Sequence, residues 1–306
     1  MIPLFLGVAL VWYSLSKVSI EELIGYFKNA DYTYICLGLL FGLMSHLSRA
    51  YRWKFLIEPL GYRLRLPNSI MAVFSAYLVN YTIPRAGEVM RATILTNYEN
   101  VPFEKGFGTI VSERVADLVV MLSIIALTLA LEFDFIFKFM SARLDFVKLL
   151  SVGLLMMILA IITFLFLRKS QSKFAVKFRK FVNGLVEGIM SIFKMKKKWA
   201  FIFHTLFIWL MYLSMFYATT FALPETSNLP LAAILIGFIA ASFSIAATNG
   251  GIGSYPIAVF GAFSLFSVAE EPAIAIGWIL WSSQTIMIIL LGGLSLIFLP
   301  IYNRIK

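Results

Sequence analysis

The sequence predicts an all-α polytopic membrane protein, with about six full transmembrane helices and two opposed re-entrant helical hairpins. Apolar residues make up 60% of the 306-residue chain, and the mean hydropathy of +0.88 excludes an ordinary soluble domain. Uncharged apolar runs recur, several of them near the roughly 20 residues that a helix needs to cross a bilayer. Two runs are interrupted, at residues 84–91 and 248–256. No long hydrophilic stretch separates the runs, so we expect 1–306 to form a single integral membrane domain.

The basic residues predict the order in which the chain crosses the membrane, because basic loops stay in the cytoplasm. Ten of the 26 Lys and Arg residues lie in 168–198, whereas the connections 17–31 and 132–148 hold only five. The predicted full spans are 2–15, 32–48, a helix containing 118–131, 146–167, 199–221 and 273–300. Both termini are then cytoplasmic, and the net charge of +10 indicates contact with anionic lipid rather than nucleic acid.

The first interrupted run, 69–113, is expected to be a re-entrant hairpin. A single crossing by 69–83 would place the basic connector outside, so the chain must return. These 15 residues span only about 22 Å, less than a bilayer core of roughly 30 Å. We expect the hairpin to descend as 69–83 and to return through 102–113, although two complete crossings would satisfy the same charge distribution.

The second interrupted run, 229–268, is expected to be a hairpin that enters from the opposite face. Residues 226–269 carry no charge, and acidic residues bound this stretch on both sides. The glycine-rich break at 249–256 would form the tip. Two broken segments, one in each half of a chain, are typical of transporters with a binding site near the membrane midplane.

The sequence predicts amphipathic helices in two of the connections between spans. In 19–30, apolar residues recur at helical spacing, and Ser19 with Glu22 matches a capping box. In 168–198, apolar residues spaced along one face are interspersed with basic residues, which predicts a helix lying on the anionic inner leaflet. A solvated cytoplasmic connector is the alternative for 168–198.

Four clusters of polar residues interrupt the apolar sequence and supply the candidate substrate-binding residues. They are Arg49 and Arg52; Asn80, Arg85, Glu88 and Arg91; Glu113, Arg114 and Asp117; and Asn249, Gly250, Gly251, Gly253 and Tyr255. Arginine forks bind phosphate through paired hydrogen bonds, which makes the first cluster a candidate phosphate site. The alternative is that these arginines anchor the helix at the membrane interface, together with Tyr51 and Trp53.

The second and third clusters combine acids with arginines. If a helix restarts after Pro84, Glu88 can bridge Arg85 and Arg91, and this network would hold an anionic headgroup or neutralise itself. Glu113 and Asp117 share a helix face and could pair with Arg85 or Arg91, exchange protons, or form a structural ion-pair cluster.

The fourth cluster is a glycine-rich turn. Its three glycines permit close approach of the backbone to a ligand or another helix. If a helix starts after Pro256, its first amides would favour an anion. Because His46 and His204 lack metal-ligand spacing and no nucleotide-binding or nucleophile motif occurs, we expect no metal, no cofactor and no catalytic residue.

The four clusters, in this order, resemble the transmembrane, flippase-type domain of lysylphosphatidylglycerol synthase and the stand-alone proteins that share it. The matching pieces are residues 49–53, Asn80 with 83–88 and Arg91, Glu113-Arg114 with Asp117, and 250–253. The resemblance covers nearly the whole chain. In the family pattern Pro-Gly-Gly-x-Gly-x-x-Glu, however, Asn249 replaces the proline and Pro256 takes the position of the acid, so a role for that acid is not expected here.

The resemblance implies a bacterial or archaeal cytoplasmic-membrane protein that moves a polar lipid between leaflets. In the full-length synthases a soluble domain attaches lysine to the lipid; this sequence ends at Lys306, so aminoacylation is not expected. We therefore expect a flippase for a phosphate-bearing phospholipid or glycolipid, compatible with a homo-oligomer and not an enzyme. The alternatives are a membrane enzyme or accessory subunit acting on a lipid-linked substrate, and a small-solute secondary transporter.

Overall fold

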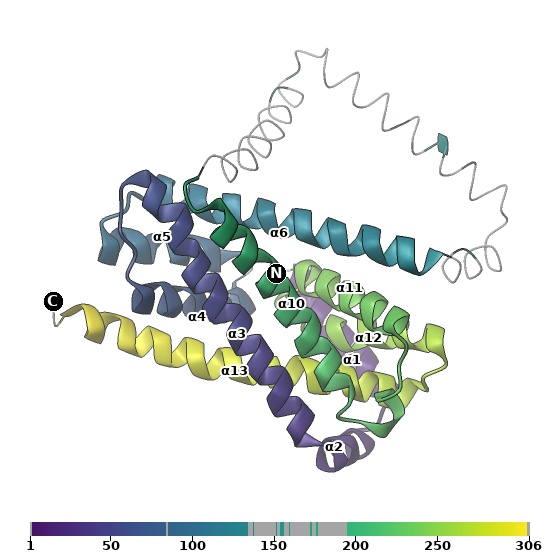
Figure 1. The fold of residues 1–306 in the computed structure, drawn as a ribbon. Coiled ribbons are helices and arrows are strands. Elements are labelled where there is room, and N and C mark those ends of the chain that lie inside the picture. Colours follow the sequence, from purple (N-terminus) through teal and green to yellow (C-terminus); the bar gives the residue numbers. More distant parts are fainter. Residues whose placement is uncertain are drawn as a thin grey trace. The chain divides into compact units, whose positions relative to one another are not determined.

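A computed structural model of the chain describes residues 2–83, 85–133 and 195–304, with isolated positions between 134 and 194. Throughout this described part the regular elements are helices, and no strand occurs (Figure 1). The chain forms two compact units, Met1–Glu113 together with Lys197–Lys306, and Arg114–Lys196. Most of the predicted span 146–167 and most of the connector 168–198 lie outside the described residues.

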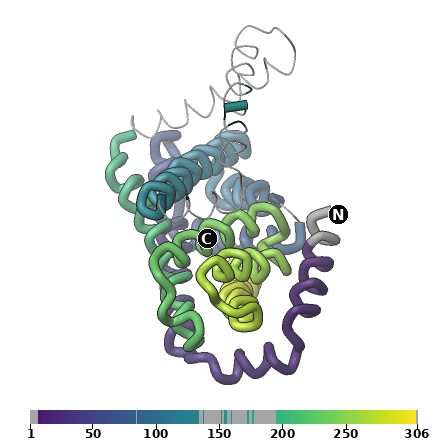
Figure 2. The backbone as a smooth tube through the Cα atoms, turned by 90° about the vertical axis from the view of Figure 1, so that its right-hand side faces the viewer, coloured from purple at the N-terminus to yellow at the C-terminus, as the bar shows by residue number. Residues whose placement is uncertain are grey.

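The N-terminal helices α1 (Ile2–Lys17) and α2 (Ile20–Asn29) meet at a capping box. The Ser19 hydroxyl accepts a hydrogen bond from the Glu22 amide at 3.2 Å, and the Glu22 carboxylate accepts one from the Ser19 amide at 3.0 Å. These bonds satisfy amides that the first helical turn leaves free and confirm the start predicted from the sequence. Helix α2 lies crosswise to α1 and α3 at one end of the first unit (Figures 1 and 2).

Helix α3 (Tyr32–Ile57) pairs along its length with α10 (Lys198–Thr220). Close approach depends on small residues, because a Cβ added at Gly38 would meet the Thr219 hydroxyl. The sequence ended this span at residue 48, but the helix continues for more than two further turns, which places Arg49 and Arg52 inside it. Three described helices are long and apolar enough to cross a membrane: α6 (Phe103–Leu131), α10 and α13 (Glu270–Arg304).

The first hairpin consists of α4 (Leu66–Thr82) and α5 (Ala86–Glu99). At its tip the Gly87 amide donates to Asn80 Oδ1 at 2.8 Å, and a Cβ at Gly87 would overlap the Ala76 carbonyl. At its open end Glu99 accepts from Arg65 Nε at 3.0 Å. The two limbs are therefore antiparallel and in close contact.

The returning limb is α5, and the prediction that the chain returns through 102–113 is wrong. Arg85 adopts the left-handed conformation at φ 61°, so the chain reverses at once and a helix restarts at Ala86. A second left-handed residue, Asn100 at φ 54°, then ends α5. Residues 103–113 instead begin α6, which runs on without a break.

The second hairpin consists of α11 (Leu231–Ala247) and α12 (Ser254–Phe263), and α12 packs against both α11 and α13. Helix α12 begins at Ser254, so Pro256 lies within its first turn and not before its start. The tips of the two hairpins touch, because a Cβ at Gly250 would lie 2.6 Å from Cε1 of Tyr81. The Tyr81 hydroxyl also lies 3.1 Å from the Thr285 hydroxyl of α13, which fixes its ring at this junction.

Candidate functional site

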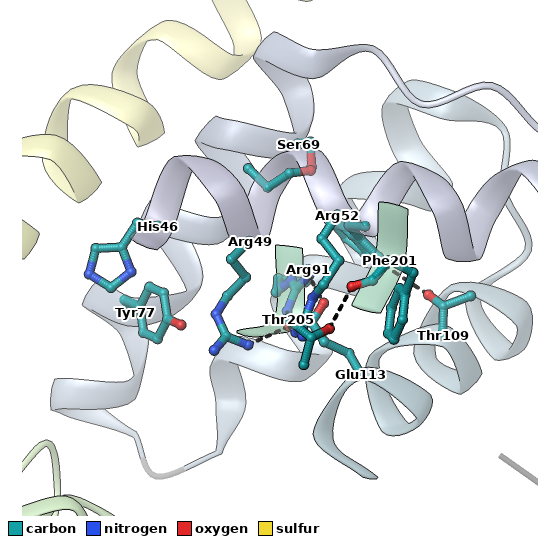
Figure 3. Close-up of polar contacts among 12 residues, drawn as sticks. His46, Arg49, Arg52, Ser69, Tyr77, Arg91, Thr109, Glu113, Phe201 and Thr205 are labelled. Carbon is teal, nitrogen blue, oxygen red and sulfur yellow. Dashed lines mark hydrogen bonds and ion pairs between the residues drawn. The ribbon is translucent and has the colours of Figure 1, made fainter. Parts of the chain in front are cut away.

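Three arginines converge on one buried carboxylate, that of Glu113 (Figure 3). Arg49 Nη1 donates to Oε1 at 2.7 Å, and Arg91 donates to Oε1 and Oε2 at 3.1 and 3.0 Å. Arg52 Nη2 lies 3.5 Å from Oε1. We call Arg49, Arg52, Arg91 and Glu113 the arginine cluster. Its members come from α3, α5 and α6, so it ties the first hairpin to two other helices.

Neighbouring side chains hold the guanidinium groups in position. Arg52 Nη1 donates to the Thr205 hydroxyl of α10 at 2.7 Å. The Arg91 guanidinium lies 4.0 Å from the centre of the Trp53 ring, close enough for a cation–π interaction. Trp53 is itself fixed, because its indole N–H donates to the Thr109 hydroxyl at 2.9 Å. The forks are therefore oriented by packing as well as by charge.

The arginine cluster is fully buried. Exposed fractions are 2% for Arg49, 3% for Arg91, and zero for Arg52 and Glu113. Taking charges out of water is costly, and a buried ion pair rarely stabilises a protein more than apolar residues of similar volume would. Charged groups within membrane helices commonly line substrate pathways. The alternative of interfacial anchoring does not describe Arg49 and Arg52, nor Trp53, which is completely buried.

Aromatic and polar side chains extend from the arginine cluster along α3 and α4. The Arg49 guanidinium lies 6.0 Å from the ring centre of Tyr212, whose hydroxyl is 3.5 Å from both His46 Nδ1 and the Tyr77 hydroxyl. His46 packs against Tyr77 with ring centres 4.8 Å apart. These contacts connect the arginine cluster to α4, whose last turn carries Tyr81 at the junction of the hairpin tips.

The other charged candidates differ in how far they are buried. Arg85 is exposed at the tip of the first hairpin, and Glu88 is half-buried on α5. The sequence offered Arg85 and Arg91 as partners for Glu113, and Glu113 pairs with Arg91. Arg114 is exposed and Asp117 is buried, and both belong to the second unit.

The fourth cluster forms the connection between α11 and α12, the loop 248–253. Gly250, Gly251 and Gly253 all have positive φ, at 61°, 82° and 68°. A Cβ at Gly253 would lie 2.6 Å from the carbonyl oxygen of Gly7 in α1, so only glycine allows this crossing. Asn249 and Tyr255 are buried. The loop is thus a rigid turn enclosed by neighbouring helices.

Several site residues were not predicted from the sequence. Thr205, Thr109 and Tyr212 are ordinary residues of apolar helices, and no local pattern distinguishes them. Trp53 carried a usable signal, because it lies at i+4 from Arg49 and therefore shares its helix face. In the part of the chain that the structure describes, no group of three or more His, Cys, Asp or Glu side chains could hold a metal ion.

A bundle of apolar helices with two broken hairpins and a buried arginine cluster defines a helical membrane protein with a polar internal site. The chain belongs to the family described as the lysylphosphatidylglycerol synthase transmembrane region, whose profile matches residues 1–293. Among its relatives is UPF0104 membrane protein MJ1595 of Methanocaldococcus jannaschii.

The M. jannaschii protein is 25% identical over 293 residues, covering 86% of this chain and 83% of the relative. Glycosyltransferase AglD of Haloferax volcanii is 29% identical over 99 residues, covering 32% of this chain and only 16% of that protein. No solved structure matches the chain.

Proposed function

We propose that the protein moves a polar, phosphate-bearing phospholipid or glycolipid between the leaflets of a bacterial or archaeal cytoplasmic membrane. The observation that carries this proposal is the arginine cluster, in which three oriented guanidinium groups lie buried among membrane helices. Such groups match the geometry of phosphate oxygens. Membership of a lipid-related membrane family supports the proposal, as does the presence of two hairpins whose tips meet.

In this proposal, exchange of Glu113 for a phosphate is the central step. Arg49 and Arg91 donate to the same carboxylate oxygen, so Glu113 occupies the forks when no lipid is bound. A phosphate offers more acceptor oxygens than one carboxylate and would compete for the same donors. Glu113 then serves as an internal counterion that keeps the arginines in place between transport events.

The remaining polar candidates act around this exchange. Exposed Arg85 attracts the anionic headgroup to the hairpin tip. Arg114 assists Arg85 in attracting the headgroup, and Asn80 holds the hairpin tip closed. Glu88 and Asp117 balance the positive charge of the arginines or bind a cationic substituent of the lipid. The loop 248–253 with Tyr255 closes the opposite side of the pathway.

Topology completes the proposal. Both termini and the connector 168–198 face the cytoplasm, where the connector contacts the anionic inner leaflet. The two hairpins enter from opposite faces, an arrangement suited to alternating access. Transport is passive or ion-coupled, because the sequence carries no nucleotide-binding motif.

The test is leaflet movement of fluorescent lipids in proteoliposomes, read by dithionite quenching. The panel contains phosphatidylglycerol, its lysyl form and a glycolipid. Arg91→Lys keeps the charge but loses the fork, whereas Arg65→Lys makes the same change at Glu99, outside the arginine cluster. We expect movement to fall in Arg91→Lys and to persist in Arg65→Lys. Equal activity in both folded variants would overturn the role of the arginine cluster.

A second candidate is an enzyme, or its accessory subunit, that acts on a lipid-linked substrate. The partial match to a glycosyltransferase favours it, although the matched segment is only 16% of that protein. An enzyme changes its lipid covalently. Mass spectrometry of lipids recovered from the proteoliposomes would therefore reveal a new product if this candidate is correct, and unchanged masses would exclude it for the lipids tested.

A further inference from the structure

We infer that the loop 248–253 binds a monovalent metal cation. The observation that carries the inference is the side chain of Asn249, which is only 4% exposed and whose Oδ1 has no hydrogen-bond partner within the described part of the chain. Buried side-chain polar atoms nearly always have a partner, and an exception requires an explanation. A bound ion would supply the missing partner.

The surroundings of Asn249 are rich in hydrogen-bond acceptors. The last backbone hydrogen bond of α11 runs from the Thr248 amide to the Ser244 carbonyl at 3.2 Å. The carbonyls that follow have no intrahelical amide partner, and the helix dipole adds partial negative charge at this end. The candidate ligands are therefore Asn249 Oδ1 and the carbonyl oxygens that end α11, which are hard oxygen ligands of the kind that alkali cations accept.

Some of the donors that an anion would use near this loop are occupied or absent. Pro256 has no amide proton, and the Tyr255 amide donates to the Gly251 carbonyl at 2.9 Å. The Trp281 indole N–H donates to the Gly250 carbonyl at 2.8 Å. Near the start of α12, positions 255 and 256 therefore offer no free amide to an anion.

The hydroxyl groups of the loop are also used. Thr248 Oγ1 and Ser254 Oγ lie 2.7 Å apart, and both also contact the Ser244 carbonyl, at 3.0 and 3.2 Å. These bonds fix the loop backbone without involving Asn249. Because the ligands are neutral oxygens, a singly charged ion suits the loop better than a divalent or transition metal ion.

The position of the loop gives the ion a role if the proposed function holds. Gly253 packs on the backbone of α1, and Gly250 packs on Tyr81 at the tip of the first hairpin. An ion bound between these contacts would hold the two hairpin tips together. Release of the ion would free them, so the cation would act as the coupling ion, as at broken helices of other transporters.

The experiment measures binding of ²²Na⁺ to the purified full chain in detergent, together with Tm in NaCl, KCl and choline chloride at equal ionic strength. We expect saturable binding and a rise in Tm with one alkali cation that choline does not reproduce. Asn249→Leu should weaken the apparent affinity by about tenfold or more, the loss expected for one buried polar ligand. Asn29→Leu, at an exposed asparagine of α2, is the control and should leave affinity unchanged.

Asn249→Asp keeps the oxygen ligands and adds a negative charge, so it should bind the cation more tightly even if Asn249→Leu fails to fold. Equal Tm in all three salts with no binding of ²²Na⁺ would overturn the inference, as would unchanged affinity in Asn249→Asp. If KCl alone raises Tm, the ion is K⁺ and the inference stands. Ion binding without lipid movement would support the cation site and refute the proposed lipid movement. Lipid movement without ion binding would refute the cation site and leave the proposed function standing.

Discussion

Replacing Glu113 by Gln should destabilise the protein more than any other single change of similar size. The substitution keeps the shape but removes a negative charge that Arg49, Arg52 and Arg91 all contact. Three hydrogen bonds of 2.7–3.1 Å reach this carboxylate. Removing one partner of a buried ion pair costs about 3–5 kcal/mol. We expect a loss in this range, because the Gln carbonyl retains part of the bonding.

The assay is equilibrium unfolding of the purified chain in mixed micelles with increasing SDS, followed by tryptophan fluorescence. Glu99→Gln is the control, because Glu99 also accepts from an arginine: the Arg65 Nε–H is shared between its two carboxylate oxygens at the open end of the first hairpin. The Arg65 side chain is 30% exposed, so water screens this pair and about 1 kcal/mol is expected.

A loss for Glu113→Gln no larger than that for Glu99→Gln would refute the reasoning. The double variant Glu113→Gln with Arg49→Gln supplies a second check. Removing one of the cations that Glu113 contacts should recover part of the lost free energy, so the two changes should not be additive. Additive losses would show that Arg49 and Glu113 do not interact.

Three further outcomes follow from the fold. Gly87→Ala should lower stability by about 1–3 kcal/mol because the added methyl group overlaps a carbonyl of α4, whereas Gly108→Ala, which faces open space, should not lower it. Arg85→Gly should keep stability within about 1 kcal/mol, since glycine tolerates φ 61°, but should reduce lipid movement. Hydrogen bonds from the Ser19 hydroxyl and then its amide lower the pKa of Glu22 below 4.5. Protection of the first turn of α2 against hydrogen exchange should therefore be complete above pH 4.5 and fall as the pH drops through the lowered pKa. Ser19→Ala should weaken this dependence, because the hydroxyl is lost while the amide of residue 19 remains.

Local signals in the sequence predicted the helix breaks well. Pro84 and the glycines of 249–253 mark both hairpin tips, and the pair Ser19 and Glu22 marks the start of α2. Each signal acts over a few residues through backbone geometry or capping, so it needs no knowledge of tertiary contacts.

The arginine cluster could be predicted only in part. Its residues stood out as charges in apolar surroundings, but Glu113 lies 64 residues from Arg49 in sequence, and their contact depends on how α3 and α6 pack. The end of the second span at residue 48 was wrong for a related reason. A run of charges resembles a cytoplasmic loop, yet here tertiary partners keep Arg49 and Arg52 within the helix.

Hydropathy also failed to separate the lipid-facing surface from the core. Cys36, for example, lies in an apolar run typical of a core, but it is exposed on α3. Lipid tails are as apolar as a protein interior, so both surfaces of a membrane helix favour the same residues. The direction in which a side chain points must then come from small residues such as Gly38 and Gly42, which mark the packed face of α3.

The two inferred sites have opposite preferences and share one mechanical element, the first hairpin. Its limb α5 carries Arg91, its limb α4 carries Tyr81 against Gly250, and the Gly87 contact joins the limbs. If release of Glu113 shifts Arg91, the hairpin transmits that shift to the loop 248–253. Coupling between two binding sites is reciprocal, so a cation that raises headgroup affinity by some factor must itself bind more tightly by the same factor when the headgroup is present. Titration of ²²Na⁺ with and without phosphatidylglycerol should show this factor, and Gly87→Ala should reduce it; identical affinities in folded wild-type protein would show that the sites act independently.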